Sequence, residues 1–282
     1  GAVSTTESRE LLEVIDRQEW TEPVADTLER GITQALDETG AAGRGAADFL
    51  HGTWMGHPLH PAVTDVPLGA WTAAAVMDTL DAVKGHDRYS AGSDAAVAVG
   101  LVGAALAAVS GLADWRYTQG TARKVGVVHA SLNGSATLLY AASLALRGRG
   151  KRGMGRALSF AGFAAVVAAA YLGGHLTYAE RVGVDHAPPP DELPDHFTPV
   201  MADADLLEGT MQCVEVDGTP IMLARQHGRL YALAEHCAHL GGPLSEGTLE
   251  EGAVVCPWHG SRYALETGHA LNGPTAYPQP CL

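Results

Sequence analysis

Three long stretches of the chain contain no Asp, Glu, Lys or Arg. They cover residues 95–113, 125–146 and 157–179, which are 19, 22 and 23 residues long. A helix rises about 1.5 Å per residue, so about 20 residues cross a hydrocarbon core of about 30 Å. A fourth stretch, residues 62–83, contains three Asp but has an apolar centre at residues 66–77. The pattern predicts four membrane-spanning helices; core helices of a soluble fold are the alternative.

Small residues repeat within the second of these stretches. Gly103, Ala107 and Gly111 are spaced four apart, so a helix places them on one ridge. Small residues at this spacing allow helix backbones to approach closely in lipid. We therefore expect a compact four-helix bundle.

The segments on either side of the predicted bundle have different patterns. Residues 7–38 are acidic, and we expect Pro23 to break them into two amphipathic helices on the membrane surface or on the C-terminal domain. Their apolar positions fall near helical spacing at Leu11, Leu12, Ile15, Val24, Leu28, Ile32 and Leu36. Residues 182–196 hold four prolines, which favour an extended, semi-rigid linker.

Beyond the linker the pattern changes to short β-type runs. Cys213–Val216 and Pro220–Ala224 flank an Asp217-Gly218 turn, which indicates a hairpin. Further strands are expected at Arg229–Ala234, Ala253–Val255 and Ser261–Leu265. The predicted fold is multidomain: an all-α four-helix transmembrane bundle and a small all-β domain. The predicted boundaries are 1–50 for the acidic helical segment, 51–181 for the bundle, 182–196 for the linker and 197–282 for the β domain.

Charge is unevenly distributed along the chain. The net charge of -14 combines -7 in residues 1–50, +4 in residues 51–184 and -11 in residues 185–282. A nucleic-acid-binding protein would need a basic face, so this class is excluded. Four Cys in 282 residues argue against a disulfide-stapled scaffold. The first thirty residues show no signal-peptide pattern.

Two short motifs carry the strongest chemical signal. Cys237-Ala-His239 is followed, after sixteen residues, by Cys256-Pro-Trp-His259. Two thiolates and two imidazoles on two loops suit a metal centre, and the donor types alone leave zinc open. The full stretch, Cys-Ala-His-Leu-Gly-Gly-Pro-Leu and then Cys-Pro-Trp-His-Gly-Ser, resembles the Rieske [2Fe–2S] family. The resemblance covers residues 197–282 and implies that Cys237 and Cys256 bind one iron while His239 and His259 bind the other.

The same resemblance implies roles for five more residues. In high-potential members a serine and a tyrosine after the second motif donate hydrogen bonds to sulfur, and Ser261 and Tyr263 occupy these positions. We therefore expect an intermediate-to-high reduction potential. Leu240, Gly273 and Pro274 match the residues that cover the cluster in this family.

The sequence departs from the family in two places. Quinol-oxidising members carry a loop disulfide at positions that hold Gly242 and Trp258 here, so the cluster is expected to be of the ferredoxin type. The family usually continues with a closing strand, whereas this chain stops at Cys281-Leu282. A truncated C-terminus is expected for that reason.

Histidines of the predicted bundle form a second signal. His57-Pro-Leu-His60-Pro resembles the opening of an uncharacterised four-helix membrane-domain family, over residues 50–180. With four spans, His57, His60, His129 and His175 fall at one membrane face, which is also the face of the Rieske domain. Haem b, another metal, a quinone, or plain interfacial histidines bonded to backbone or water all remain open.

These features predict a multi-pass protein of the plasma membrane that carries out single-electron transfer. Its redox donor and acceptor are unidentified, and the acidic C-terminal region suits a basic partner. A quinol oxidoreductase, in which His239 or His259 accepts the quinol proton, and a redox sensor are the alternatives. A complete Rieske oxygenase is not expected, because no second iron-binding domain is visible. Loop charges favour the outside for the Rieske domain, but the missing signal peptide shifts our expectation to the cytoplasmic face.

Overall fold

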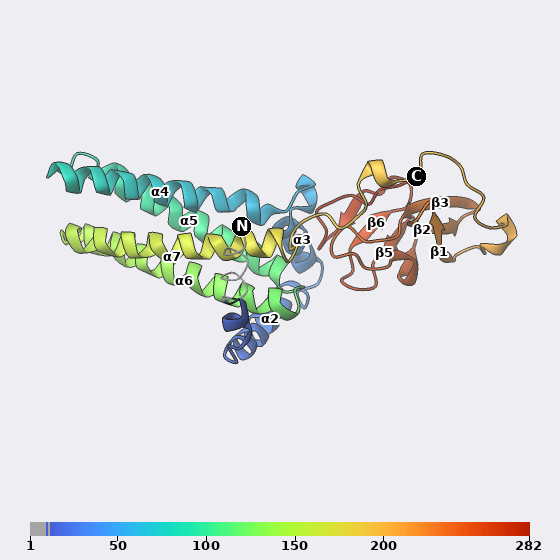
Figure 1. Ribbon diagram of the computed structural model, residues 1–282, viewed down its shortest axis with the longest axis horizontal. Coiled ribbons are helices and arrows are strands. Elements are labelled where there is room, and N and C mark those ends of the chain that lie inside the picture. The colour runs from blue at the N-terminus through green and yellow to red at the C-terminus, as the bar shows by residue number, and fades with distance from the viewer. Residues whose placement is uncertain (1–9, 11) are drawn as a thin grey trace. The chain divides into compact units, whose positions relative to one another are not determined.

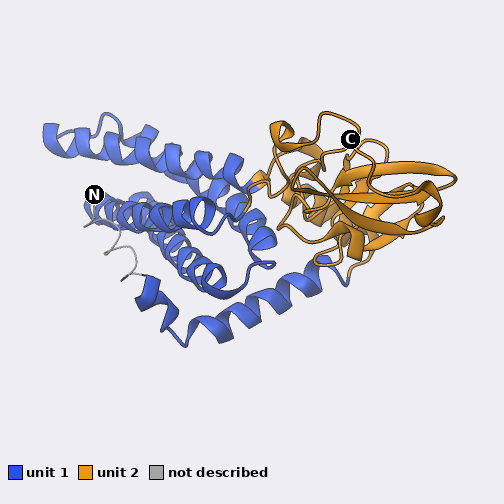
Figure 2. Cartoon of the chain, turned by 45° about the vertical axis from the view of Figure 1, so that its right-hand side comes forward, with its two compact units in different colours: residues 1–38, 60–182 blue, residues 39–59, 183–282 orange. Residues whose placement is uncertain are grey.

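The computed structural model describes residue 10 and residues 12–282 and divides the chain into two compact units (Figures 1 and 2). A helical unit comprises the chain up to residue 38 together with residues 60–182, and a Cys/His-containing β unit comprises residues 39–59 and 183–282. The start of the predicted acidic segment, including Leu11, lies outside the described residues.

Four long helices form the body of the helical unit, as expected. They are α4 (Leu59–Lys84), α5 (Ser90–Trp115), α6 (Gly120–Gly148) and α7 (Arg152–Tyr178). Two of them, α5 and α7, are long and apolar enough to cross a membrane. The described residues also form α2 (Thr21–Leu36) and α3 (Ala41–His51), so the helices are not limited to the four predicted spans.

The predicted ridge of small residues lies at the contact between α4 and α5. A Cβ added at Gly103 would meet Val66 and Pro67 of α4 at 2.7 and 2.8 Å, and one added at Gly111 would meet His60. Glycine is therefore required here by the close approach of the two helices.

The acidic helix α2 packs on α6 of the helical unit, which corrects the expectation of a position on the C-terminal domain; the membrane-surface position stays a prediction. Ala25 is buried in a cluster with Trp115 and Val127. Arg123, just inside α6, pairs with Asp26 at 2.8 Å and with another acid of α2. Pro23 does not break a helix, because it lies in the first turn of α2, where its missing N–H costs no hydrogen bond.

The β unit contains two antiparallel sheets. The first has the order β1 (Met211–Val216), β2 (Thr219–Gln226) and β3 (Arg229–Ala234). The second sheet has four strands in sequence order, and its members are β4 (Thr248–Glu250), β5 (Ala253–Val255), β6 (Arg262–Ala264) and β7 (Ala270–Asn272). The predicted hairpin is confirmed, since Asp217 and Gly218 have φ values of 53° and 83°, as its two-residue turn requires. The sequence pattern did not predict β4 and β7.

The end of the chain pairs with β3. Cys281 forms an antiparallel bridge with Leu233, and the Leu282 N–H donates to the Ala232 carbonyl at 3.0 Å. The last two residues thus pair with β3, at the edge of the first sheet.

Two segments outside the strands belong to the β unit. One is α3 with the short helix η1 (Thr53–Met55), and the other is the predicted linker. The linker is bound along the β domain: the Tyr277 hydroxyl donates to the Gly183 carbonyl at 3.1 Å, and the His186 N–H donates to the Ala238 carbonyl at 3.0 Å. The compact units thus follow side-chain and backbone contacts rather than the boundaries that composition suggested.

Candidate metal centre

The two Cys/His motifs occupy loops with the same backbone hydrogen bonds. The Cys237 N–H donates to the Gly242 carbonyl at 2.9 Å, and the Gly241 N–H returns to the Cys237 carbonyl at 2.7 Å. In the second loop the Cys256 N–H donates to the Ser261 carbonyl at 2.8 Å, and the Gly260 N–H returns to Cys256 at 3.1 Å. Gly241 and Gly260 both have φ near +77°, a conformation that favours glycine. One tight loop is therefore used twice.

The repeated loop brings the two thiols together. Cys237 and Cys256 are 1% and 3% exposed, and their side chains are within hydrogen-bond distance of each other. The hydrogen bond from Cys237 lowers the pKa of Cys256 to about 7, so one thiolate forms readily at this position. The same contact and burial raise the pKa of Cys237.

The two imidazoles form a second pair. The rings of His239 and His259 are perpendicular, with centroids 5.1 Å apart. Burial lowers the pKa of both, and the positive charge of the neighbouring His259 adds to this effect at His239. Both rings are therefore neutral near pH 7, which is the form that binds metal. Two donor pairs side by side fit a centre with two metal ions and two protein ligands each.

Tyr263 and Ser261 lie beside this donor set, on or next to β6. The Tyr263 hydroxyl is 3.1 Å from the Cys237 sulfur, and burial raises the pKa of Tyr263 well above its usual value, so it remains a donor. Ser261 is fully buried, and its oxygen accepts the N–H of Thr275 at 3.2 Å. That bond leaves the Ser261 hydroxyl hydrogen available for a second partner.

The third loop follows β7 and contains two of the predicted cover residues. Pro274 is buried, Gly273 is half-buried, and the peptide between them is cis. Asp48 of α3 fixes this loop: its carboxylate accepts the Gly273 N–H at 2.7 Å and the Asn272 amide at 2.9 Å. The Thr53 hydroxyl donates to the Thr275 carbonyl at 2.9 Å. Leu240, the other cover residue, is half-buried at the first loop.

Comparison with known proteins shows the family of this domain. A family described as the Rieske [2Fe-2S] domain matches residues 196–282. The ferredoxin component of the naphthalene 1,2-dioxygenase system from Pseudomonas putida is 37% identical over 71 residues, which are 25% of this chain and 68% of that protein. The chain belongs to the Rieske [2Fe–2S] family.

Other comparisons concern the helical part of the chain and the share of each relative that the Rieske match covers. A family described as a predicted membrane protein, DUF2231, matches residues 56–186. Human apoptosis-inducing factor 3 is 35% identical over 95 residues, which are 33% of this chain but only 15% of that relative. The ferredoxin of carbazole 1,9a-dioxygenase from Nocardioides aromaticivorans IC177 is 26% identical, covers 30% of this chain and 83% of its own, and has a TM-score of 0.29.

The residues of this Rieske domain fit a [2Fe–2S] cluster. The sulfur pair is buried beside a tyrosine hydroxyl, and the imidazole pair is neutral. A Cβ added at Gly242 would lie 2.9 Å from the Cys256 sulfur and 3.0 Å from Trp258. Gly242 and Trp258 are thus neighbours, as expected for the positions that hold the loop disulfide in quinol-oxidising members.

Sequence reasoning missed three residues of the Rieske domain. Asp48 and Thr53 hold the third loop from a segment that neither family match assigns to this domain. Gln279 holds the first loop: its side chain accepts the Ala238 N–H at 2.9 Å and donates to the Ala234 and His236 carbonyls. No local pattern marks such residues, because their partners lie far away in the sequence.

The four histidines of the second signal have different partners. His60 and His129 lie in the helical unit, where their Nδ1 atoms are each 2.8 Å from a backbone carbonyl, that of Ala107 and that of Ala169 respectively. His175 instead lies 3.2 Å from the Glu180 carboxylate. His57 belongs to the Rieske unit, where its ring packs edge-on against Tyr277 with centroids 6.3 Å apart.

Proposed function

We propose that this chain is a membrane-anchored Rieske protein that accepts and donates single electrons. Cys237 and Cys256 hold one iron of its cluster, and His239 and His259 hold the other. The observation that carries this assignment is the repeated loop, which places thiol beside thiol and imidazole beside imidazole. A bound cluster of this type supplies one-electron chemistry.

The surrounding residues support electron transfer rather than catalysis on a bound substrate. Tyr263 donates a hydrogen bond toward the sulfur pair, which favours the reduced, more negative state. Both imidazoles are half-buried, and the neighbouring Trp258 is 56% exposed, so the histidine side of the site reaches the surface of the unit. Electrons enter and leave on this side.

The charge of the Rieske domain favours a basic redox partner. Residues 185–282 contain fourteen acids and three bases. All three arginines are already paired with acids, at 2.5 Å for Arg225–Asp203, 3.1 Å for Arg229–Glu266 and 2.9 Å for Arg262–Glu250. The remaining acids steer a partner with a basic face, and this attraction weakens as salt rises.

The helical unit anchors the protein as a multi-pass domain of the plasma membrane. In addition to the two apolar helices, α4 and α6 cross the bilayer, because their buried charges Asp78 and Arg147 neutralise each other inside the bundle. We place the Rieske domain on the cytoplasmic face.

The cluster assignment is tested on the full chain, purified in detergent from a membrane fraction. Visible and EPR spectra are recorded during a potentiometric titration. We expect a Rieske-type signal that titrates with one electron per chain. Cys256→Ser should abolish the signal, whereas Cys213→Ser, which removes an exposed thiol of β1, should leave it intact. A wild-type spectrum without this signal, or a Cys256→Ser protein that keeps it, would refute the proposal.

A further inference from the structure

The helical unit contains an internal repeat that is not visible as sequence identity. Three side chains of α4 recur on α6 with the same spacing of eleven and then seven residues. The α4 set is His60, Trp71 and Asp78, and the α6 set is His129, Tyr140 and Arg147. Since α4 and α6 are separated by one antiparallel helix, they run in the same direction, and the two sets occupy equivalent heights.

The partner helices repeat as well. The Trp71 ring packs on Gly100 of α5, where an added Cβ would lie 2.2 Å from its Nε1 atom, and the Tyr140 ring packs on Gly162 of α7 at 3.0 Å. The histidines follow the same rule: an added Cβ would lie 2.6 Å from the His60 ring at Gly111 and 3.1 Å from the His129 ring at Gly173. The α4–α5 and α6–α7 pairs are therefore two copies of one arrangement, related by an approximate two-fold axis along the bundle.

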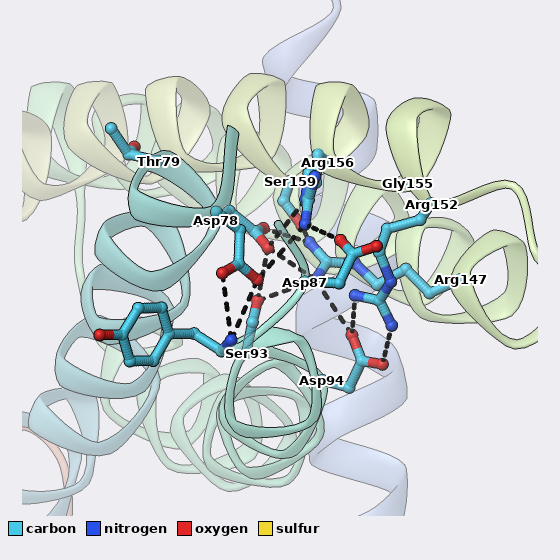
Figure 3. Close-up of polar contacts among 12 residues, drawn as sticks. Asp78, Thr79, Asp87, Ser93, Asp94, Arg147, Arg152, Gly155, Arg156 and Ser159 are labelled. Atoms are coloured by element: carbon cyan, nitrogen blue, oxygen red, sulfur yellow. Dashed lines mark hydrogen bonds and ion pairs between the residues drawn. The ribbon is translucent and has the colours of Figure 1, made fainter. Parts of the chain in front are cut away.

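Two of the three equivalent positions meet directly across this axis. Trp71 and Tyr140 stack, with ring centroids 4.1 Å apart and an interplanar angle of 11°. We call this pair the aromatic layer. Asp78 and Arg147 form a buried ion pair, with one Nη1–Oδ1 distance of 3.1 Å, and Ser93 joins both (Figure 3). This pair with its partners Ser93, Asp94, Arg152, Arg156 and Ser159 is the ionic layer.

The third equivalent position holds the two histidines. His60 Nδ1 is 2.8 Å from the Ala107 carbonyl, and His129 Nδ1 is 2.8 Å from the Ala169 carbonyl. A carbonyl only accepts, so each Nδ1 carries the hydrogen and, in the neutral ring, each Nε2 carries the lone pair. The amide of Asn133 lies 3.1 Å from the His129 Nε2, as a donor to that lone pair. We call His60 and His129 the histidine layer.

Each ring of the histidine layer has the hydrogen bond that is typical of a metal-binding histidine. Histidines that bind metal through Nε2 characteristically donate Nδ1–H to a carbonyl or carboxylate, which fixes the ring. A bare zinc ion in a structural site takes four protein ligands, whereas this layer supplies two imidazoles. Two imidazoles suit instead a metal that arrives with its own equatorial donors, as the iron of haem does with four ring nitrogens.

We propose that the Nε2 atoms of His60 and His129 are the axial ligands of a haem within the helical unit. The fixed rings and their two-fold placement support the site. The His129 Nε2 lone pair that would hold the iron is the one that now accepts from the Asn133 amide, so Asn133 would lose this hydrogen bond. This proposal rests on the helical unit alone and is independent of the iron–sulfur assignment.

The test uses the full chain, expressed in haem-proficient cells and purified in detergent. Haem is measured as the pyridine haemochrome, and low-spin ferric haem is measured by EPR. We expect about one haem per chain, and His60→Ala and His129→Ala should each reduce haem content about tenfold or more. His175→Ala is the matched control, because that ring bonds Glu180, and should retain haem.

Folding and ligation are separated by chemical rescue. In His60→Gly, added imidazole should restore the low-spin signal, which a purely structural role would not allow. Helical circular dichroism and gel filtration of the same samples report whether the helical unit of each variant is intact. The proposal is overturned if the wild-type chain binds no haem even after incubation with haemin. It is also overturned if both alanine variants keep their haem, or if extracts contain quinone but no haem.

Discussion

The two units of this molecule are both built on a repeat, but they use it differently. In the helical unit the copies meet through buried side chains, as in the aromatic and ionic layers. In the Rieske unit the repeated element is a loop, and the two loops bring thiol beside thiol and imidazole beside imidazole. Tyr263 and Gln279 bond the first of these loops, and Asp48 holds the third loop.

Because of this difference, we expect substitutions in the helical unit to change mainly the free energy of unfolding, and substitutions at the cluster loops to change mainly the reduction potential. Removing one partner of a buried layer leaves a cavity or an uncompensated charge, so the free energy of unfolding should fall strongly. Removing a hydrogen bond at a cluster loop costs less, but it changes the field at the site and should move the reduction potential. Substitutions in the two units should therefore give opposite patterns of effect.

The largest effect is expected in the ionic layer. Both side chains of the Asp78–Arg147 pair are fully buried. Asp78→Ala leaves the Arg147 charge without this partner and should lower the free energy of unfolding by about 3–5 kcal/mol, measured by denaturation in detergent. Asp87→Asn is the matched control: it also removes a carboxylate from an arginine, but Asp87 is 66% exposed, so the loss should stay below about 1 kcal/mol.

A double variant sharpens this prediction. Replacing both partners, in Asp78→Leu with Arg147→Met, removes the charge as well as its partner and should recover most of the stability. Equal stability of Asp78→Ala and wild type would show that the layer contributes nothing. The reduction potential of the cluster should be the same in all these variants.

A smaller loss is expected in the aromatic layer. A Cβ at Gly100 would clash with the Trp71 ring at 2.2 Å, so Gly100→Ala should cost about 1–3 kcal/mol. Gly134→Ala in α6 meets no atom within 4 Å and should instead stabilise its helix by up to about 1 kcal/mol. Thermal unfolding of the two proteins measures this contrast. A shift of the unfolding temperature in the same direction in both variants would show that the packing of Trp71 on Gly100 does not stabilise the bundle.

How much of each unit could be predicted from the sequence depends on whether its contacts are local or distant in the sequence. The proposed Cys and His ligands could be named from the sequence because each loop keeps its donors within four residues. The hairpin turn was also local. Asp48 was invisible, since its partners Asn272 and Gly273 lie 224 and 225 residues away.

The repeat of the helical unit was hidden by exchange of residue types. Equivalent positions hold Trp71 and Tyr140, or Asp78 and Arg147, because each residue has to complement its counterpart rather than resemble it. Hydropathy predicted the four long helices, and the spacing of small residues predicted one contact of α5. The pairing of charged residues inside the bundle could be seen only in the structure.

In the Rieske unit, we expect substitution of Asp48 to have the strongest effect on the third loop. Asp48→Ala removes two hydrogen bonds to a carboxylate, worth about 1.5–3 kcal/mol each at most, and leaves the Gly273 N–H without this acceptor. Faster hydrogen exchange at Gly273 and a shifted cluster potential are expected. Glu251→Ala removes an exposed acid of the same unit and should change neither. Unchanged exchange at Gly273 in Asp48→Ala would show that α3 does not hold the loop.

The smallest expected change in stability, with a clear change in chemistry, is at Tyr263. Tyr263→Phe removes the hydroxyl that lies 3.1 Å from the Cys237 sulfur and keeps the buried ring. That bond is stronger in the reduced state, because reduction adds negative charge to the sulfurs, so its loss should lower the potential. A difference of about 1 kcal/mol between the two states corresponds to about 40 mV, since about 59 mV is a tenfold change for one electron. Potentiometric titration measures the shift, with Tyr231→Phe in β3 as the control. An unchanged potential in Tyr263→Phe would remove the link between this hydrogen bond and the redox chemistry, and leave the tyrosine as a core residue like those of the aromatic layer.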